Sequence, residues 1–250
     1  MEQLVSVVMP CYNGEKYISQ AIESVLNQSY SNIELLVIDD CSTDSSAEII
    51  KQYQNKDKRI KYFKTQQPSG SPTLPRNIGL QKSNGQYIAF LDCDDYWNST
   101  KIQNQIALFN DKSVVLVFSN YEKIDELGNK NNRLIIAPAK VDYFELLKGD
   151  CIGTLTAIYD KTKAKDLRFS NVGAEDYIFF IELLKKGGIA LNTNSIEAFY
   201  RQTKISLSGN KLKSARWNWN IYRNLLKLGL GKSIYYFIIY AFRGLFKYLK

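Results

Sequence analysis

Three carboxylates stand within four residues at the end of an apolar run, Tyr87 to Leu91. They belong to Asp92, Asp94 and Asp95. Crowded carboxylates repel one another and are costly to desolvate unless a cation lies among them, and oxygen ligands suit a hard divalent ion such as Mg²⁺ or Mn²⁺. The pattern is typical of a buried strand that delivers acids to a phosphate-binding site. The alternative is a solvated acidic turn before a helix that starts near Asn98.

The 250 residues include no histidine, which excludes Ser-His-Asp and Cys-His catalysis. The cysteines are scattered singly, and this favours reduced thiols in the cytosol over disulfides or a zinc site. The N-terminus runs from Met1 directly into an apolar segment, so we expect no secretory signal. The four cysteines are Cys11, Cys41, Cys93 and Cys151.

The net charge of +8 is concentrated near the C-terminus. Residues 211–250 hold nine Lys or Arg and no acid, whereas residues 1–210 hold 24 basic and 25 acidic residues. Aromatic residues are interleaved with the basic ones, which favours an anionic membrane surface over nucleic acid as the partner. The apolar run from Ile234 to Phe242 is too short to cross a bilayer, which takes about 20 residues. We expect an amphipathic helix in the cytoplasmic leaflet, with packing on the domain or on a homodimer partner as the alternative.

Apolar runs alternate with helical periodicity through the first half of the chain. The pattern predicts strands at 4–9, 33–38, 60–63 and 87–91. It predicts helices at 17–26, from a cap at Ser42 or Thr43 to about Tyr53, and at 72–82. This alternation implies right-handed crossovers and a mainly parallel sheet, whose ligands lie at the carboxyl ends of the strands. The polar clusters occur at such ends: 11–13, 39–40 and 92–95.

The second half alternates less regularly. We expect strands at 114–119, 134–136 and 155–159, and helices at 141–148 and 177–186. Common nucleotide-binding loops are missing, because no Gly-x-Gly-x-x-Gly follows the first strand and Leu226 replaces the first glycine of a Walker A loop. The interpretation is one α/β domain over residues 1–208 and a basic, aromatic-rich helical tail over 209–250.

Five segments in order resemble the successive motifs of family 2 glycosyltransferases. The resemblance implies a GT-A type nucleotide-sugar-binding domain, with a mainly parallel central sheet flanked by helices, and an inverting transfer from a UDP or dTDP sugar to an acceptor hydroxyl. It also implies Mg²⁺ or Mn²⁺ as cofactor. The segments are Val5–Asn13, Val37–Asp44, Pro75–Gly79, Phe90–Trp97 and Gly173–Asp176.

The resemblance assigns the donor-binding residues one by one. Asp40 matches the carboxylate that accepts the imide N–H of uracil or thymine, beside Pro10, Tyr12 and Asn13. Asp39 is grouped with these residues, although a helix N-terminal charge is its alternative role. Arg76 is placed to meet the diphosphate or the base. Its alternative is a surface arginine.

The acidic motif and the second half supply the remaining roles. Asp92 matches the ribose-binding acid and Asp94 the metal ligand. Asp95 is expected to support the loop or the acceptor, and Cys93 is grouped with the substrate-binding residues. Asp176 matches the general base, next to Glu175, although both acids could instead favour the dipole of the following helix. Members often carry a histidine in the loop at 200–208, and here Arg201 or Lys204 is expected to bind diphosphate instead.

We therefore interpret the chain as a glycosyltransferase peripheral to the inner face of the cell membrane, which extends a lipid-linked oligosaccharide for a surface polysaccharide. A non-catalytic assembly subunit is one alternative, and the acids at 40, 92, 94 and 176 argue against it. A nucleotidyltransferase on a related sheet is the other, and it would normally carry a glycine-rich, basic loop after the first strand.

Overall fold

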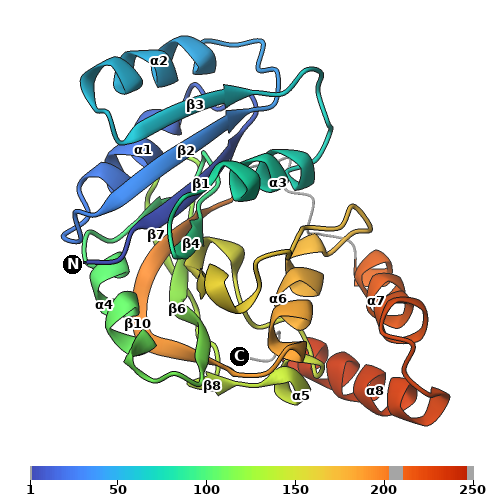
Figure 1. Cartoon of the computed structure of the whole chain (residues 1–250). Helices are drawn as coiled ribbons and strands as arrows, with labels where there is room; N and C mark the ends of the chain where they lie inside the picture. Colours follow the sequence, from blue (N-terminus) through green and yellow to red (C-terminus); the bar gives the residue numbers. More distant parts are fainter. Residues whose placement is uncertain (1, 203–210, 247–250) are drawn as a thin grey trace.

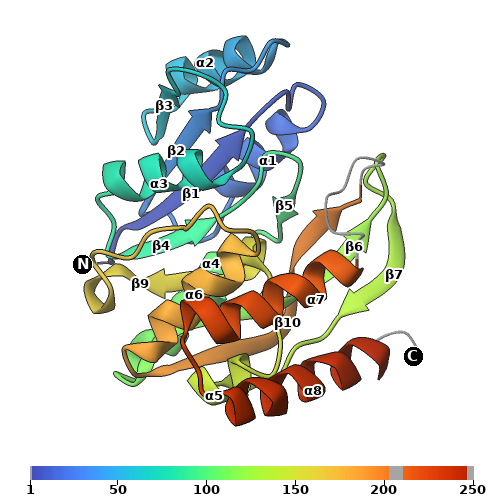
Figure 2. The same ribbon diagram turned by 90° about the vertical axis from the view of Figure 1, so that its right-hand side faces the viewer.

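The computed structural model describes residues 2–202 and 211–246, in which one mixed sheet carries helices on both faces (Figures 1 and 2). The first half contains β1 (Val5–Cys11), α1 (Ile18–Leu26), β2 (Ile33–Asp39), α2 (Ser46–Lys56), β3 (Ile60–Lys64), α3 (Thr73–Lys82), β4 (Tyr87–Phe90), β5 (Tyr96–Trp97) and α4 (Lys101–Ile106). The second half contains β6 (Val114–Ile124), β7 (Lys130–Ile135), β8 (Lys140–Val141), α5 (Tyr143–Leu146), β9 (Ile158–Asp160), α6 (Glu175–Lys185), β10 (Ile189–Arg201), α7 (Lys211–Asn220), a π-helical turn (Ile221–Leu225) and α8 (Leu230–Phe246).

The strand order is β3-β2-β1-β4-β9-β6-β10-β5, with β7 paired to β6 and β8 to β10. Strands β1 to β4 are mutually parallel where they pair, and β9 runs antiparallel to both β4 and β6. Cys11 pairs with Asp39, and Val8 pairs with Phe90. The acidic segments after β2 and β4 therefore leave the sheet at the same edge, on either side of β1.

The alternation of side chains along these strands divides the core into two layers. In β1, Val8 belongs to the layer covered by α3 and α6, while Val7 and Met9 belong to the layer covered by α1, α2 and α4. Helix α3 approaches β1 closely at Gly79, where a Cβ would lie 2.3 Å from Cγ1 of Val8. Only glycine permits this approach, which brings the first turn of α3 close to the carboxyl ends of the strands.

The predicted elements of the first half are confirmed to within a few residues, apart from the start of α2. This helix begins at Ser46, because the carboxylate of Asp44 accepts from the backbone N–H of Ser46 at 3.0 Å. Ser42 is not its cap, since its hydroxyl accepts from the N–H of Asn13 at 3.0 Å. Thr43 instead donates its backbone N–H to the side chain of Asn13.

Larger differences occur in the second half. The sequence pattern predicts a helix at 141–148, but α5 covers only Tyr143–Leu146 and follows the short strand β8. The strand predicted at 155–159 is β9, displaced to Ile158–Asp160. The long strand β10 was not predicted at all. The middle of this strand is polar, and its register shifts against β6. Both features disturb the alternation of apolar and polar residues by which a strand is recognised in a sequence.

The C-terminal segment is packed on the domain over part of its length. Ile221 and Tyr222 are buried in the core layer of α6, and the hydroxyl of Tyr222 donates to the carbonyl of Leu147 at 2.7 Å. Ser233 of α8 is buried as well. The division at residue 208 stays a proposal about two sequence segments, because packing among the described residues is continuous across it. Within residues 2–202 and 211–246, no helix has the length and apolar character that crossing a bilayer requires.

Candidate functional site

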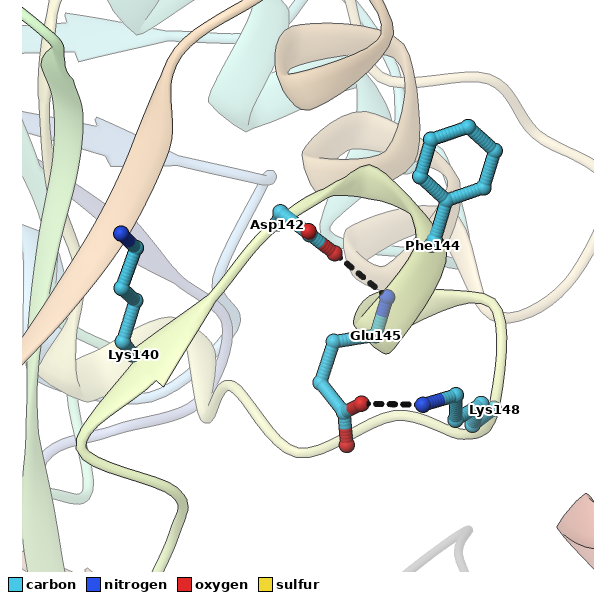
Figure 3. Close-up of a pocket in the computed structure, with 5 residues that line it drawn as sticks. All are labelled: Lys140, Asp142, Phe144, Glu145 and Lys148. Atoms are coloured by element: carbon cyan, nitrogen blue, oxygen red, sulfur yellow. Dashed lines mark hydrogen bonds and ion pairs between the residues drawn. The ribbon is translucent and has the colours of Figure 1, made fainter.

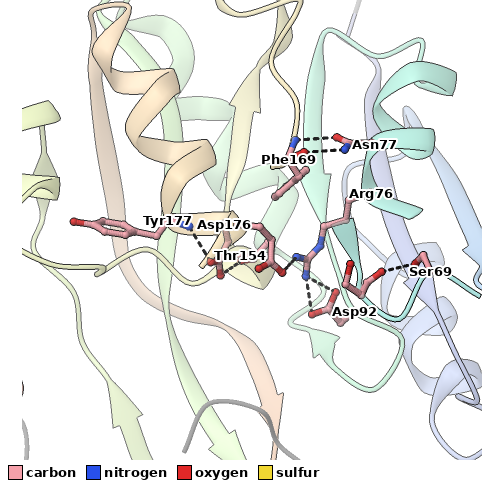
Figure 4. A network of polar contacts seen from close by, with 10 residues as sticks. Ser69, Arg76, Asn77, Asp92, Thr154, Phe169, Asp176 and Tyr177 are labelled. Atoms are coloured by element: carbon pink, nitrogen blue, oxygen red, sulfur yellow. Dashed lines mark hydrogen bonds and ion pairs between the residues drawn. The ribbon is translucent and has the colours of Figure 1, made fainter. Parts of the chain in front are cut away.

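Arg76, in the first turn of α3, stands at the centre of a polar network that joins three of the five motif segments (Figure 4). Its Nη2 atom donates to both carboxylate oxygens of Asp92, at 2.8 and 3.1 Å. Its Nη1 atom lies 3.5 Å from Oε1 of Glu175. The side chain of Arg76 is only 5% exposed, so it is not the surface arginine of the alternative interpretation.

Electrostatics explain why this buried guanidinium stays charged. Burial disfavours the charge, but the carboxylates of Asp92, Asp176 and Glu175 outweigh it, and the pKa of Arg76 is raised. Burial also raises the pKa of Glu175, and the charge of Asp176 adds to this, while Arg76 opposes it. The cation and the three acids therefore stabilise one another, and removal of the cation would leave the acids in mutual repulsion.

Two residues that the sequence did not single out hold Arg76 in place. The guanidinium lies over the ring of Phe169, with 5.4 Å from Cζ to the ring centroid. The side chain of Asn77 donates to the carbonyl of Phe169 at 2.9 Å and accepts from its N–H at 2.8 Å. Asn77 lies inside the motif at Pro75–Gly79, so its position in the sequence could have indicated a role in the site. Phe169 lies in a loop, and nothing in the sequence around it indicated such a role.

Asp176, the predicted general base, lies in the first turn of α6. Its Oδ2 atom accepts from the hydroxyl of Thr154 at 2.8 Å, and its Oδ1 atom accepts from the N–H of Tyr177 at 2.8 Å. Thr154 was not predicted, because it comes from a short helical turn that precedes β9. Each oxygen has one donor, which fixes the orientation of the carboxylate and leaves lone pairs for a proton.

Asp40, the predicted partner of the nucleobase, is almost fully buried and already hydrogen-bonded. Thr65 donates its hydroxyl to Oδ1 at 2.9 Å, while Ser69 donates its N–H at 3.0 Å and its hydroxyl to Oδ2 at 2.8 Å. The loop at 65–72 thus lies against the carboxylate. A base that donates to Asp40 has to share it with Ser69 or displace that residue, and the contact stays a prediction.

Asp39 is held by hydrogen bonds from within the protein. It is fully buried, its carboxylate accepts from the N–H of Ser42 and from the hydroxyl of Tyr62, both at 2.8 Å, and it thereby joins β2 to β3. Burial and this hydrogen bond raise the pKa of Tyr62. The predicted substrate contact of Asp39 has no support in this geometry, because both oxygens face the protein interior.

The three residues predicted beside the base continue from the end of β1. Pro10 is buried within the strand, whereas Tyr12 is 56% exposed. Asn13 has a left-handed backbone with φ of 50°, and its side chain accepts from the N–H of Thr43 at 2.9 Å. The two loops at the edge of the sheet are therefore fixed to each other, with the ring of Tyr12 left accessible.

The acidic motif points its residues in different directions. Burial and the charge of Asp92 raise the pKa of Asp94 to about 6. Asp95 is buried, accepts from the N–H of Arg201 at 2.8 Å, and has a buried Oδ2 without a hydrogen-bond partner. Burial and then the charge of Asp94 raise its pKa. Asp95 therefore supports the loop from inside, whereas Asp94 is only half-buried.

Cys93 also faces inward. It lies against Cys11 and against Gly14, where a Cβ would come within 2.8 Å of its sulfur. The contact with Cys11, together with burial, raises the pKa of the Cys93 thiol. It packs the acidic loop onto β1, and the structure shows no side of it turned toward a ligand.

Arg201 and Lys204 were predicted to bind diphosphate. The guanidinium of Arg201 is instead buried, lies 4.4 Å from the ring centroid of Tyr17, and donates to the carbonyls of Asp94 and Glu126 at 2.8 and 3.0 Å. Its remaining nitrogen donates to Gln20 at 2.6 Å. The prediction for Arg201 is thus not supported, because its donors are used within the protein. Lys204 lies outside the described residues.

The residues fit a divalent cation only as a partly protein-bound ion. Among residues 2–202 and 211–246, no group of three or more His, Cys, Asp or Glu is arranged to hold a metal. Mg²⁺ commonly uses one or two carboxylates together with substrate phosphates and water, and a single acid such as Asp94 meets that requirement. Asp94 is half-buried and lies near the charge of Asp92, which helps to raise its pKa, so an added cation here would relieve the repulsion between the two acids.

A separate hollow lies beside α5 (Figure 3). Within it Lys148 donates to Glu145 at 2.6 Å, and Arg243 of α8 donates to the other oxygen of Glu145 at 2.7 Å. None of its lining residues belongs to the five motif segments. The lining residues are Lys140, Asp142, Phe144, Glu145 and Lys148.

The chain is similar to known proteins along almost its whole length. The chain is 46% identical over 249 residues to an uncharacterized glycosyltransferase of Haemophilus influenzae, which covers 99% of this chain and 98% of that protein. It is 36% identical over 251 residues to WfgD of Escherichia coli, named UDP-Glc:alpha-D-GlcNAc-diphosphoundecaprenol beta-1,3-glucosyltransferase, with coverage of 99% and 96%.

A crystal structure of Staphylococcus aureus TarS, residues 1–349 in complex with UDP-GlcNAc, superposes with a TM-score of 0.72 at 22% identity. The match covers 89% of this chain and 67% of that one. The expected GT-A type fold, with its central sheet, flanking helices and C-terminal helical tail, is thereby confirmed. The model of the family described as Glycosyl transferase family 2 matches residues 6–169. With relatives aligned along nearly their whole length, this match shows that the chain belongs to glycosyl transferase family 2.

Proposed function

We propose that this chain is a metal-dependent inverting glycosyltransferase that transfers one sugar from a UDP or dTDP sugar to a hydroxyl of a lipid-linked oligosaccharide. The observation that carries the proposal is the network around Arg76, which joins Asp92 of the acidic motif to the acids at the start of α6. A donor-side acid and a candidate base thus share one buried cation. A structural role alone would not require so many carboxylates at one edge of a sheet.

Each residue of the network has a proposed task. Asp176 takes the proton of the attacking hydroxyl, with Thr154 holding the carboxylate in position. Arg76 offsets the charges of Asp92 and Glu175, which lowers their repulsion toward the anionic diphosphate of the donor. A Mg²⁺ or Mn²⁺ ion bound at Asp94 would neutralise the charge that develops on the departing diphosphate.

The names of relatives support the donor and acceptor classes. WfgD and WfaP of Escherichia coli are named for UDP-Glc as donor and a diphosphoundecaprenol-linked GlcNAc as acceptor. TuaG of Bacillus subtilis is named as a putative teichuronic acid biosynthesis glycosyltransferase and is 35% identical over 239 residues. We therefore place this chain in the synthesis of a surface polysaccharide.

Helix α8 supports a location at the inner face of the cell membrane. One face carries apolar side chains every four residues, and these are 43 to 57% exposed. Residues 211–250 contain no acid, and Arg243 of α8 pairs with Glu145 of the domain. Such a helix binds an anionic interface through its apolar face. The exposed apolar residues are Leu230, Ile234, Ile238 and Phe242.

The test is a screen of UDP and dTDP sugars, with a GDP sugar as control, for binding in Mn²⁺ and in EDTA. Transfer is then measured onto a polyprenyl diphosphate-linked sugar, with the released nucleotide identified. We expect one UDP or dTDP sugar to bind only with metal and to release the nucleoside diphosphate. In a parallel incubation with UTP or dTTP and a sugar 1-phosphate, release of pyrophosphate would identify a nucleotidyltransferase. The absence of any nucleotide-sugar binding would favour an assembly subunit.

A further inference from the structure

Helix α7 reaches the loop that precedes the proposed base. The indole of Trp217 lies directly against Gly173, where a Cβ would come within 2.5 Å of Cε2, 2.8 Å of Nε1 and 2.9 Å of Cζ2. Real Cβ atoms do not approach other atoms this closely, so only glycine can occupy the position against the ring. Trp217 and Gly173 are therefore fitted to each other, although the first lies in the C-terminal segment and the second three residues before Asp176.

The backbone at this contact has an unusual conformation. Gly173 has φ of +76° and Ala174 has φ of +50°, so two successive residues are left-handed. L-residues such as alanine disfavour this region, and Ala174 has no side-chain oxygen with which to cap α6. The turn aims Glu175 and Asp176 at their partners, yet little within its own sequence favours its shape. Support has to come from contacts made by other elements.

The π-helical turn that follows α7 is anchored on the domain. Its first residue, Ile221, is buried and lines a small hollow together with Val172 and Ile178. Tyr222 follows and is anchored by its hydrogen bond to the carbonyl of Leu147. Positions four residues apart share one face of a helix, so Trp217 and Ile221 present a continuous surface to the loop.

We propose that Trp217 is a positioning residue for the transfer reaction. Its indole seats on Gly173 and holds the left-handed turn that places the carboxylate of Asp176 beside Thr154. The inference rests on the proposed role of Asp176 as the base. Because catalysis by a base depends on its placement to within about 1 Å, a loosened turn lowers turnover more than it changes donor binding. The donor motifs lie at the ends of β1, β2 and β4, on segments that Trp217 does not support.

The first experiment compares Trp217→Ala with Trp219→Ala. Trp219 is the matched control, since it lies on the same helix but packs against Phe237 of α8, with 5.4 Å between ring centroids. We expect Trp217→Ala to lower kcat by about tenfold or more with donor KM within about threefold of the wild type. Trp219→Ala should keep kcat. Trp217→Phe, which restores a ring, should recover part of the loss, and thermal unfolding should show that all variants are folded.

A second experiment uses the close contact itself. Gly173→Ala inserts a methyl group where the ring lies and adds strain at a positive φ, so it should also lower kcat. In the double variant with Trp217→Ala, the ring that causes the clash is gone. We expect the fall in kcat of the double variant to be smaller than the product of the falls in the two single variants.

Amide hydrogen exchange gives a readout that does not need transfer activity. Exchange at residues 171–176 should be faster in Trp217→Ala and unchanged in Trp219→Ala. Equal exchange in the two variants, or a loss confined to donor KM, would overturn the positioning role. Normal turnover of Asp176→Asn would instead refute the proposed base, and the exchange comparison would still decide whether Trp217 holds the turn.

Discussion

Replacement of Arg76 by methionine tests whether one buried cation holds the acids of the site together. Methionine keeps an unbranched, flexible stem but removes the charge that now contacts Asp92 and Glu175. Removal of one partner from a fully buried ion pair costs about 3–5 kcal/mol. The side chain of Asp92 is 37% exposed, so solvent screening reduces this cost, and we expect about 2 kcal/mol. For a chain of this size, that corresponds to a fall in Tm of about 4–8 °C.

Arg59→Met is the matched control. Arg59 also contacts a carboxylate through two nitrogens, with Nη2 at 2.8 Å and Nε at 3.1 Å from the oxygens of Asp57. Its side chain is 32% exposed and that of Asp57 is 26% exposed. The two pairs therefore differ chiefly in the burial of the arginine. A surface pair contributes about 1 kcal/mol or less, so Arg59→Met should be the milder change.

The pH dependence of the stability difference between wild type and Arg76→Met gives a further check. Burial already raises the pKa of Glu175, and loss of the opposing Arg76 should raise it further. A carboxyl with a raised pKa in the folded state destabilises the fold when it ionises, because the unfolded chain holds the proton less tightly. The loss of unfolding free energy in Arg76→Met should thus be largest at neutral pH, and it should shrink as the pH falls through the pKa of Glu175.

The assay is urea unfolding of wild type and both variants at pH 7 and at about pH 4.5, combined with turnover at pH 7. We expect Arg76→Met to lose stability and transfer activity together, whereas Arg59→Met keeps its activity. If both variants lost the same stability at both pH values, or if Arg76→Met transferred sugar at the normal rate, the account of the network would be wrong.

Three further predictions concern the metal, the base and the tail. Asp94→Ala should abolish Mn²⁺-dependent UDP affinity in calorimetry. In the wild type, this affinity should weaken when the pH is lowered below about 6, where Asp94 becomes protonated. An unchanged affinity in the variant would refute the assignment of Asp94 as the metal ligand. Asp176→Asn should keep donor affinity within a few-fold while turnover falls by about 10² or more, and near-normal turnover would eliminate it as the base. The pair Ile238→Ser and Phe242→Ser should lose binding to anionic vesicles while keeping the wild-type Tm. A smaller sedimenting mass with unchanged vesicle binding would instead identify a dimer contact.

The site's location could be predicted from sequence because it depends on local features. Continuous apolar runs identify β1, β2 and β4, and acids at the ends of parallel strands must meet at one edge. The contact of Arg76 with Asp92 was not predicted, since Arg76 was assigned to the diphosphate or the base. Burial of Asp39 and Asp95 does not follow from that placement of the acids, because it depends on Tyr62 and Arg201, which approach from strands elsewhere in the sheet.

The tail shows a different limit of sequence patterns. Its apolar and aromatic residues predict a helix with a broad apolar face, but they cannot tell which part of that face meets protein. The structure assigns Tyr222 and Ser233 to the interior and leaves Ile238 exposed. Thr154 and Phe169 could not be predicted either, since each acts through a neighbour that is brought to it only by the fold.

The contacts of Arg201, the last residue of β10, affect how the chain folds during translation. Its N–H bonds Asp95 across 106 residues, and its side chain bonds the carbonyl of Asp94. On the ribosome, the segment with β1 to β4 emerges first, and its acidic loop then lacks these donors. A buried carboxylate without a donor is unfavourable, so we expect the loop to stay open until residue 201 has left the exit tunnel. A nascent chain would therefore hold Asp94, the proposed metal ligand, in its final position only after β10 has emerged.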